Sequence, residues 1–179
     1  HLNEDQFWSN DQINEILDNI LNDPIDHPFF LYLNYNCRHD PLTSEKVECG
    51  LDKLKRLGML DNTIIVINSD HGYPDPSRDI SYTEMRNLGH DLVMTDDNIL
   101  VPLVFVVPSG RARTISEAVS LLDVVPTLLD LVGIGVKSLS NKNVTGRSLK
   151  QLIVGEVDKP NNTVIRIDNR YIAQPKRLS

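Results

Sequence analysis

Residues 63–72 read TIIVINSDHG and carry the strongest structural signal in the chain. The β-branched run at 63–67 has no polar alternation, which is typical of strands that are covered on both faces, as in a parallel sheet. A carboxylate and an imidazole, Asp70 and His71, follow this run directly, and Gly72 would let the backbone turn sharply beneath them. Because ligands in open α/β sheets bind outside the carboxyl ends of strands, the stretch predicts a site beside a buried strand.

Helical and strand-like segments alternate on both sides of this stretch. Apolar residues from Ile13 to Leu21 recur at i, i+3 and i+4 spacing, which predicts one face of an amphipathic helix. The short apolar run at 29–33 is read as a buried strand, because its length and aromatic content favour a strand over a helix. The further expected elements are a helix at 47–57, a strand at 101–107, helices at 123–132 and 148–154, and a strand pair near 164–167 and 171–173. This order predicts an α/β fold: a mostly parallel sheet sandwiched by helices, with a small antiparallel strand pair at the C-terminus.

Composition bounds the class of protein. The 179 residues are 40% hydrophobic and 24% charged, which is ordinary for one globular domain and argues against disorder or a coiled coil. No apolar run approaches the roughly 18 residues of a membrane span. The net charge of −7 disfavours a nucleic acid partner, since such binders usually carry a basic surface. Two cysteines, Cys37 and Cys49, exclude a disulfide scaffold and a zinc site built from cysteines.

Candidate functional residues lie in the loops that follow the expected strands. Asp70 and His71 can present one oxygen and one nitrogen to a divalent ion, although a strand-terminating turn in which Asp70 bonds local amides explains the pair equally well. His39, after the strand at 29–33, could donate a proton to a leaving oxygen or could simply belong to a solvated loop. Its neighbour Arg38 could bind an anion through charge-assisted hydrogen bonds.

Two more residues complete the set of candidates. His90 lies near the far end of residues 69–98, a loop-like stretch whose length is normally functional in a compact domain. Cys37 could act as a nucleophile, since Arg38 and His39 would stabilise a thiolate. No Cys-His hydrolase signature surrounds it, and the chain has no nucleophile elbow, Walker loop or dinucleotide-binding glycine motif.

Residues 60–72 resemble the metal-site segment of the sulfatase family, within the alkaline phosphatase superfamily. Further segments that look like family motifs follow the same order: PFFLYL and HDP within 28–41, VPLV at 101–104, LDVVPTLL with Gly133-Ile134 at 122–134, and GRSL at 146–149. The resemblance spans roughly residues 10–155 and implies an alkaline-phosphatase-like α/β fold, of which the chain holds an incomplete portion. Residues 1–155 would be the C-terminal part of a sulfatase-like catalytic domain, and residues 156–179 a C-terminal strand extension of that domain.

The resemblance implies metal-dependent hydrolysis of sulfate esters. In such enzymes a formylglycine hydrate attacks sulfur, and a divalent cation, usually calcium, polarises the ester oxygens. Asp70 and His71 would be metal ligands, and His39 would contact the ester group or protonate the leaving oxygen. His90 would bind a sulfuryl oxygen, and Arg38 is the candidate for further substrate binding. The expected partner is a small-molecule or glycan sulfate ester.

Departures from the family pattern define what this chain would lack. The Cys/Ser-x-Pro-x-Arg nucleophile motif and the Asp-Asp pair near the first strand are absent, and both belong to the N-terminal half of the family. We therefore expect the formylglycine to lie upstream in a longer chain, and we expect the isolated 179 residues to be inactive. The sequence indicates neither a compartment nor an oligomeric state.

Two other functions remain open from the sequence. His71 stands where arylsulfatases frequently have Asn, and the Asp-His pair is also common in phosphonate monoester hydrolases, choline-sulfatase-like enzymes and phosphoglycerol transferases. The alternative enzyme is therefore a phosphodiesterase, phosphonate monoester hydrolase or phosphoglycerol transferase of the same superfamily, with manganese or zinc as its metal. The non-enzymatic alternative is a truncated or vestigial module.

Overall fold

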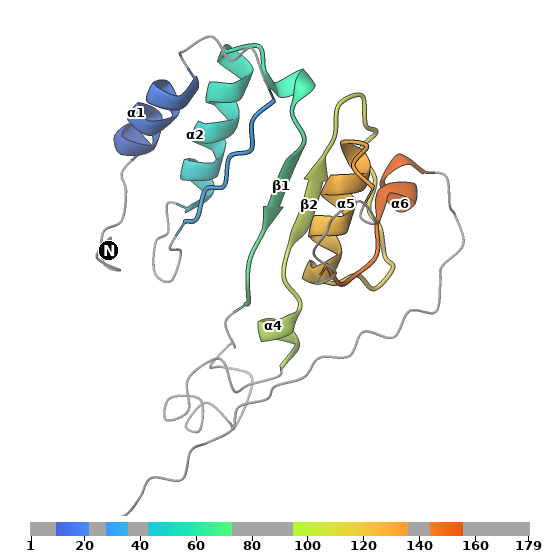
Figure 1. Cartoon of the computed structure of the whole chain (residues 1–179). Helices are drawn as coiled ribbons and strands as arrows, with labels where there is room; N and C mark the ends of the chain where they lie inside the picture. The colour runs from blue at the N-terminus through green and yellow to red at the C-terminus, as the bar shows by residue number, and fades with distance from the viewer. Residues whose placement is uncertain (1–9, 22–27, 36–42, 73–94, 136–143, 156–179) are drawn as a thin grey trace, which may run out of the picture. The chain divides into compact units, whose positions relative to one another are not determined.

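The computed structural model describes residues 10–21, 28–35, 43–72, 95–135 and 144–155 (Figure 1). The chain divides into two compact units, His1–Thr63 and Ile64–Ser179. The strand pair expected near 164–167 and 171–173, and with it the extension at 156–179, lies outside the described residues. No helix within the described ranges is both long and apolar enough to cross a membrane.

The first unit contains both helices that the apolar spacing predicts. They are α1 (Asn10–Leu21) and α2 (Thr43–Arg56), and the short 3₁₀ helix η1 (Leu60–Asn62) follows them. Leu17 on α1 is the buried centre of this unit, and an ion pair between Asp18 and Lys53 joins α1 to α2. The partly buried side chains that pack against Leu17 are Leu31, Leu33, Tyr35, Leu54, Leu57 and Met59.

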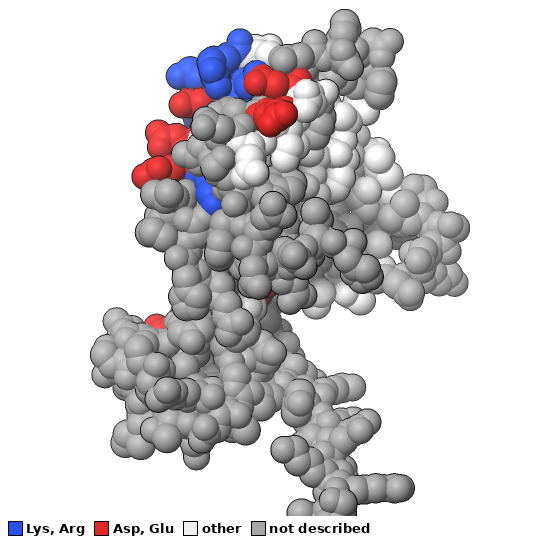
Figure 2. Space-filling model, turned by 90° about the vertical axis from the view of Figure 1, so that its left-hand side faces the viewer, with Lys and Arg blue, Asp and Glu red and all other residues white. Residues whose placement is uncertain are grey.

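Helix α2 distributes its charges as the helix dipole favours. Glu45 lies in its first turn, and Lys53, Lys55 and Arg56 lie in its last turn. Negative side chains near the N-terminus and positive ones near the C-terminus both stabilise a helix. Figure 2 shows acidic and basic side chains close together on the upper part of the face that it presents. Side chains of both charges therefore share this part of the visible surface.

The apolar run at 29–33 is extended, but it pairs with no strand among the described residues. Alternate side chains face opposite ways, as they do along any extended chain. Leu31 and Leu33 pack towards Leu17, whereas Phe30 and Tyr32 are 82% and 74% exposed. The expectation of a buried strand was therefore wrong for this part of the chain. A strand needs a partner backbone, and the described residues around this segment supply helices only.

The second unit contains the two strands that the β-branched and apolar runs predict. Strand β1 (Ile65–Asn68) pairs with β2 (Leu103–Val106) side by side (Figure 1). The pair is antiparallel, with Ile65 opposite Val106 and Asn68 opposite Leu103, whereas we expected a mostly parallel sheet. No parallel pairing occurs within the described ranges. An antiparallel pair is compatible with a mixed sheet. Because of this register, the chain leaves β1 and enters β2 at the same end of the pair.

Within the described residues of the second unit, four short helices accompany this strand pair. Within the stretch expected to be a loop, α4 (Asp96–Ile99) precedes β2. The expected helix at 123–132 is found as η3 (Leu121–Asp123) followed by α5 (Val124–Leu131), and the expected helix at 148–154 is found as α6 (Lys150–Val154). Gly133 follows α5 with a φ of +79°, a left-handed conformation that glycine adopts without strain.

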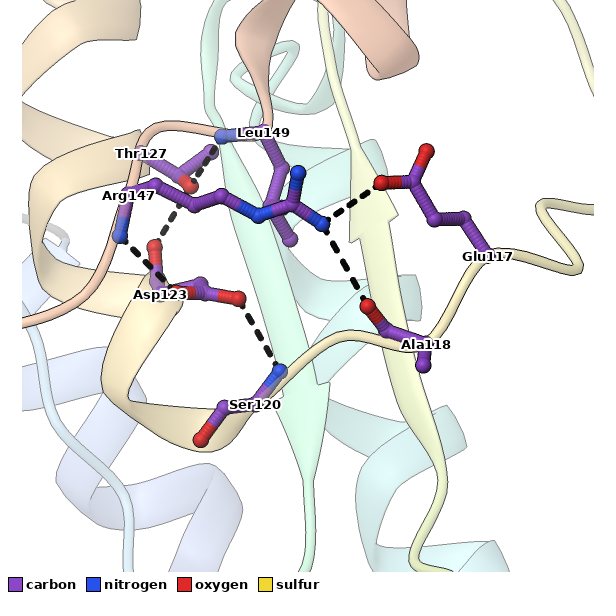
Figure 3. Close-up of polar contacts among 7 residues, drawn as sticks. All are labelled: Glu117, Ala118, Ser120, Asp123, Thr127, Arg147 and Leu149. Carbon is purple, nitrogen blue, oxygen red and sulfur yellow. Dashed lines mark hydrogen bonds and ion pairs between the residues drawn. The ribbon is translucent and has the colours of Figure 1, made fainter. Parts of the chain in front are cut away.

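A buried carboxylate ties η3 and α5 to the chain before α6 (Figure 3). Asp123 accepts hydrogen bonds from the backbone amides of Ser120, at 3.0 Å, and Arg147, at 2.9 Å. Thr127 is fully buried, donates its hydroxyl to the carbonyl oxygen of Asp123 at 2.5 Å, and accepts from the amide of Leu149 at 2.9 Å. Each of these buried polar groups thus has partners, which removes most of the cost of burying it.

The guanidinium of Arg147 adds a second connection. It donates to Glu117 Oε1 at 2.7 Å and to the carbonyl oxygen of Ala118 at 3.3 Å. The Glu117 side chain is only 6% exposed, so this ion pair is shielded from solvent on its acidic side. The network defined by Asp123, Thr127 and Arg147 therefore holds three segments of the second unit together.

A third polar contact joins α5 to α6. Ser148 donates its hydroxyl to Asp130 Oδ2 at 2.6 Å, and Lys150 Nζ lies 3.4 Å from Asp130 Oδ1. The hydrogen bond from Ser148 is the main cause that lowers the pKa of Asp130, and the positive charge of Lys150 acts in the same direction.

Replacing Asp123 by Asn tests the buried network. The new amide nitrogen would face a backbone N–H, so one buried donor loses its acceptor, and we expect the free energy of unfolding to fall by about 1–3 kcal/mol. Urea unfolding followed by circular dichroism measures the change. Asp96→Asn, at an exposed carboxylate of the same unit, is the matched control and should change stability by less than about 0.5 kcal/mol. Equal effects of the two substitutions would contradict this role for Asp123.

Replacing Ser148 by Ala tests the contact with Asp130. Because the hydrogen bond favours the ionised carboxylate, its loss should raise the pKa of Asp130 towards its ordinary value. A folded pKa below the unfolded one contributes stability that is present above the unfolded pKa and is lost as pH falls through the folded pKa. Ser148→Ala should therefore weaken acid resistance, which carboxyl NMR titration and unfolding between pH 5 and pH 2 would record. Ser116→Ala, at an exposed serine, should leave the Asp130 titration unchanged.

Candidate metal site

The predicted metal ligands lie in a tight turn directly after β1. The Ser69 hydroxyl donates to the carbonyl oxygen of His71 at 2.6 Å, and the His71 amide donates to Asp70 Oδ1 at 2.9 Å. The alternative interpretation, in which Asp70 bonds local amides, is thus part of the structure. Asp70 Oδ1 accepts this amide bond, whereas Asp70 Oδ2 lies beside Nε2 of the imidazole. The turn and a metal-binding role are therefore compatible with each other.

The backbone determines which imidazole nitrogen carries the proton. His71 Nδ1 lies 2.6 Å from the carbonyl oxygen of Gly72, and a carbonyl oxygen can only accept a hydrogen bond. Nδ1 is therefore the protonated nitrogen of the neutral ring, and Nε2 carries the lone pair. This is the arrangement that metal-binding histidines usually have, with the second nitrogen donating to a carbonyl or carboxylate.

The two candidate ligand atoms lie close together on an open part of the turn. His71 Nε2 is 3.8 Å from Asp70 Oδ2, a separation that one ion can bridge, since metal–ligand distances are about 2.0–2.6 Å. The Asp70 side chain is 87% exposed and the His71 side chain is 42% exposed. Both side chains can therefore be reached by an ion and by further ligands. A carboxylate oxygen with an imidazole nitrogen is a donor set that several divalent metals accept.

The remaining predicted site residues lie outside the described residues. These are His39, His90 and Arg38, together with Cys37. Within the described part of the chain, no group of three or more His, Cys, Asp or Glu side chains could hold a metal ion. The structure thus brings Asp70 and His71 together, and the participation of the other residues stays a prediction.

One contact of the turn was not expected from the sequence. The Gly72 amide donates to the carbonyl oxygen of Asn98 on α4 at 2.8 Å. The sequence contains no local signal for this bond, because it joins the two ends of a long connection. The buried network that links Asp123 to Arg147 was likewise not predicted, although both residues lie in segments that resemble family motifs.

Comparison with known proteins identifies the family of this segment. The sulfatase family model matches residues 46–134, which include the Asp70-His71 turn, β2 and α5. The chain is 34% identical to arylsulfatase K of Bos taurus over 97 residues, which is 54% of this chain. It is 31% identical to an N-acetylglucosamine-6-O-sulfatase of Bacteroides thetaiotaomicron over 112 residues, and 27% identical to an ulvan-active sulfatase of Formosa agariphila over 118 residues.

The matched part is a small portion of each relative. These two bacterial proteins are matched over 62% and 64% of this chain, respectively. The matches cover 16% of the Bos taurus protein, 18% of the Bacteroides protein and 21% of the Formosa protein. The chain thus spans about a fifth or less of the length of these curated relatives. Through residues 46–134, the chain belongs to the sulfatase family.

Proposed function

We propose that this chain supplies part of the catalytic domain of an enzyme that hydrolyses sulfate esters with the help of a divalent cation. The observation that carries the proposal is the pair of ligand atoms 3.8 Å apart, His71 Nε2 and Asp70 Oδ2, after β1 in the segment that the sulfatase family model matches. The match to the sulfatase family supports hydrolysis of a sulfate ester. The two candidate ligand atoms in the turn support binding of a divalent cation. The full sheet would be alkaline-phosphatase-like and mostly parallel, with residues 1–155 in the C-terminal part of the domain.

The donor set of the turn fits a divalent cation. Asp70 offers a hard oxygen ligand that suits calcium, which is the ion expected for a sulfatase, and His71 offers an imidazole that suits manganese or zinc. When bound, such a cation polarises the ester oxygens and stabilises the charge that develops on them. Asp70 and His71 would hold it at the end of β1, and the Gly72 carbonyl would orient the ring of His71 through Nδ1.

The other proposed roles belong to residues that act on the ester itself. His39 would protonate the leaving oxygen, His90 would bind a sulfuryl oxygen, and Arg38 would attract the anionic group through charge-assisted hydrogen bonds. The chain contains no Cys/Ser-x-Pro-x-Arg motif, so the formylglycine nucleophile would come from another part of the complete protein. For this reason the isolated 179 residues are expected to have no turnover.

The proposed substrate is a small-molecule or glycan sulfate ester. One of the relatives is named for N-acetylglucosamine-6-O-sulfate chemistry, which supports the glycan option. The imidazole at His71 favours a second candidate, phosphoryl transfer on the same scaffold with manganese or zinc, as in phosphodiesterases, phosphonate monoester hydrolases or phosphoglycerol transferases. Sulfate and phosphate esters of one phenol, compared at equal concentration, separate the two reactions. A non-catalytic module would hydrolyse neither.

Replacing Asp70 by Ala in the complete protein tests the proposed site. Loss of a metal ligand should lower kcat/KM for an aryl sulfate by at least roughly 100-fold and should lower the bound metal measured by mass spectrometry. Asp61→Ala, at an exposed carboxylate of η1 within the same matched segment, is the control and should leave both quantities unchanged. Unchanged metal content and turnover in the Asp70→Ala protein would show that Asp70 is not a ligand.

A further inference from the structure

Gly72 lies in unusually close contact with the backbone of α4. Its amide donates to the carbonyl oxygen of Asn98 at 2.8 Å. A Cβ placed on Gly72 would lie 1.9 Å from the carbonyl oxygen of Asp97 and 3.2 Å from the Cα of Asn98. These neighbours are main-chain atoms, so they cannot move aside as a flexible side chain would. Any larger residue would have to push the turn and α4 apart.

Space is therefore the reason for glycine at this position. The glycines of this chain that adopt a positive φ are, in the described ranges, Gly58, Gly133, Gly146 and Gly155. Gly72 is not among them, so a left-handed backbone is not the reason for glycine at this position. Beyond the expected turn, the structure thus gives a second reason for glycine at this position, the close approach of two backbones.

The same residue also holds the imidazole. The carbonyl oxygen of Gly72 accepts from His71 Nδ1 at 2.6 Å, while its amide donates to Asn98. A continuous chain of hydrogen bonds therefore runs from α4 through Gly72 to the ring of His71. A shift of Gly72 away from α4 would rotate its carbonyl and release the ring from its orientation.

From this arrangement we infer that Gly72 and the backbone of α4 form a clasp that positions His71 beside Asp70 for metal binding. The clasp is the hydrogen bond from Gly72 to Asn98 together with the contact of Gly72 against Asp97. The inference rests on the proposed metal site and adds that its affinity depends on a helix that contributes no ligand. Partners that orient a ligand typically change metal affinity by about 10–100-fold when they are lost.

Mn²⁺ titration of the ¹⁵N-labelled 179-residue chain, followed by NMR, tests this inference. In the unmodified chain, Mn²⁺ should broaden the His71 imidazole and the amides of the turn selectively, and the imidazole ¹⁵N shifts should show a proton on Nδ1. Gly72→Ala should weaken Mn²⁺ binding by about 10-fold or more and should produce a mixture of the two ring tautomers. Amide signals of Ile65 and Phe105 report whether the strand pair is intact.

Gly135→Ala is the matched control. A Cβ at Gly135 meets nothing within 4 Å, and this residue also lacks a positive φ, so the substitution changes the same atoms without a clash. It should leave Mn²⁺ affinity and the His71 tautomer as they are in the unmodified chain. Hydrogen exchange in the unmodified chain gives a measurement that needs no variant, because the Gly72 amide should exchange about 100-fold or more slowly than an open peptide amide if the clasp forms.

The outcomes distinguish the clasp from the metal site on which it rests. Equal Mn²⁺ affinity and an unchanged tautomer in Gly72→Ala would overturn the clasp and leave the metal site standing. An unprotected Gly72 amide would overturn the clasp even if the variant does not fold. Absence of selective broadening at His71 in the unmodified chain would overturn the proposed metal site and the clasp with it.

Discussion

The antiparallel register of β1 and β2 is the constraint on which the candidate site depends. Asn68, the last residue of β1, lies opposite Leu103, the first residue of β2. The chain therefore leaves β1 and enters β2 at the same end of the pair. This geometry brings the turn after β1 to the helix that precedes β2, so that Gly72 can bond Asn98. In a parallel pair the start of β2 would lie at the opposite end, and α4 would not contact the turn.

The sequence predicts the elements of this structure better than it predicts their pairing. The helix face around Leu17 and the β-branched run of β1 carry periodicities that depend only on local geometry, and both elements are found. The direction of pairing depends on where the chain returns, which a run of apolar residues does not encode. For the same reason Phe30 and Tyr32 occupy an extended segment without a strand partner among the described residues. Apolar composition indicates burial, but a sheet requires a neighbouring backbone.

The candidate site shows the same division between local and distant contacts. Asp70 and His71 are found from their place after a strand, because that rule depends on chain order. The role of Gly72 cannot be found in this way, because it depends on contact with α4. In the sequence, α4 lies within a long loop-like stretch. The bond from the Arg147 amide to Asp123 likewise spans 24 positions, although both residues stand in recognisable motifs. Sequence motifs thus locate residues with a structural or functional role. Tertiary contacts then determine whether such a residue stabilises the fold or contributes to the candidate site.

The exposure of the turn explains why orientation by the backbone matters. Asp70 is 87% exposed, so water competes for its carboxylate and two ligands alone would bind a cation weakly. Under these conditions the entropy lost in ordering each ligand is a large fraction of the binding free energy. The Gly72 carbonyl removes part of that cost for His71 before the metal binds, because the ring is already held through Nδ1. In a turn of this kind, a metal ion can bind further ligands with little rearrangement of Asp70 and His71. The two hydrogen bonds of Gly72 connect the proposed metal site to α4, and through α4 to the strand pair.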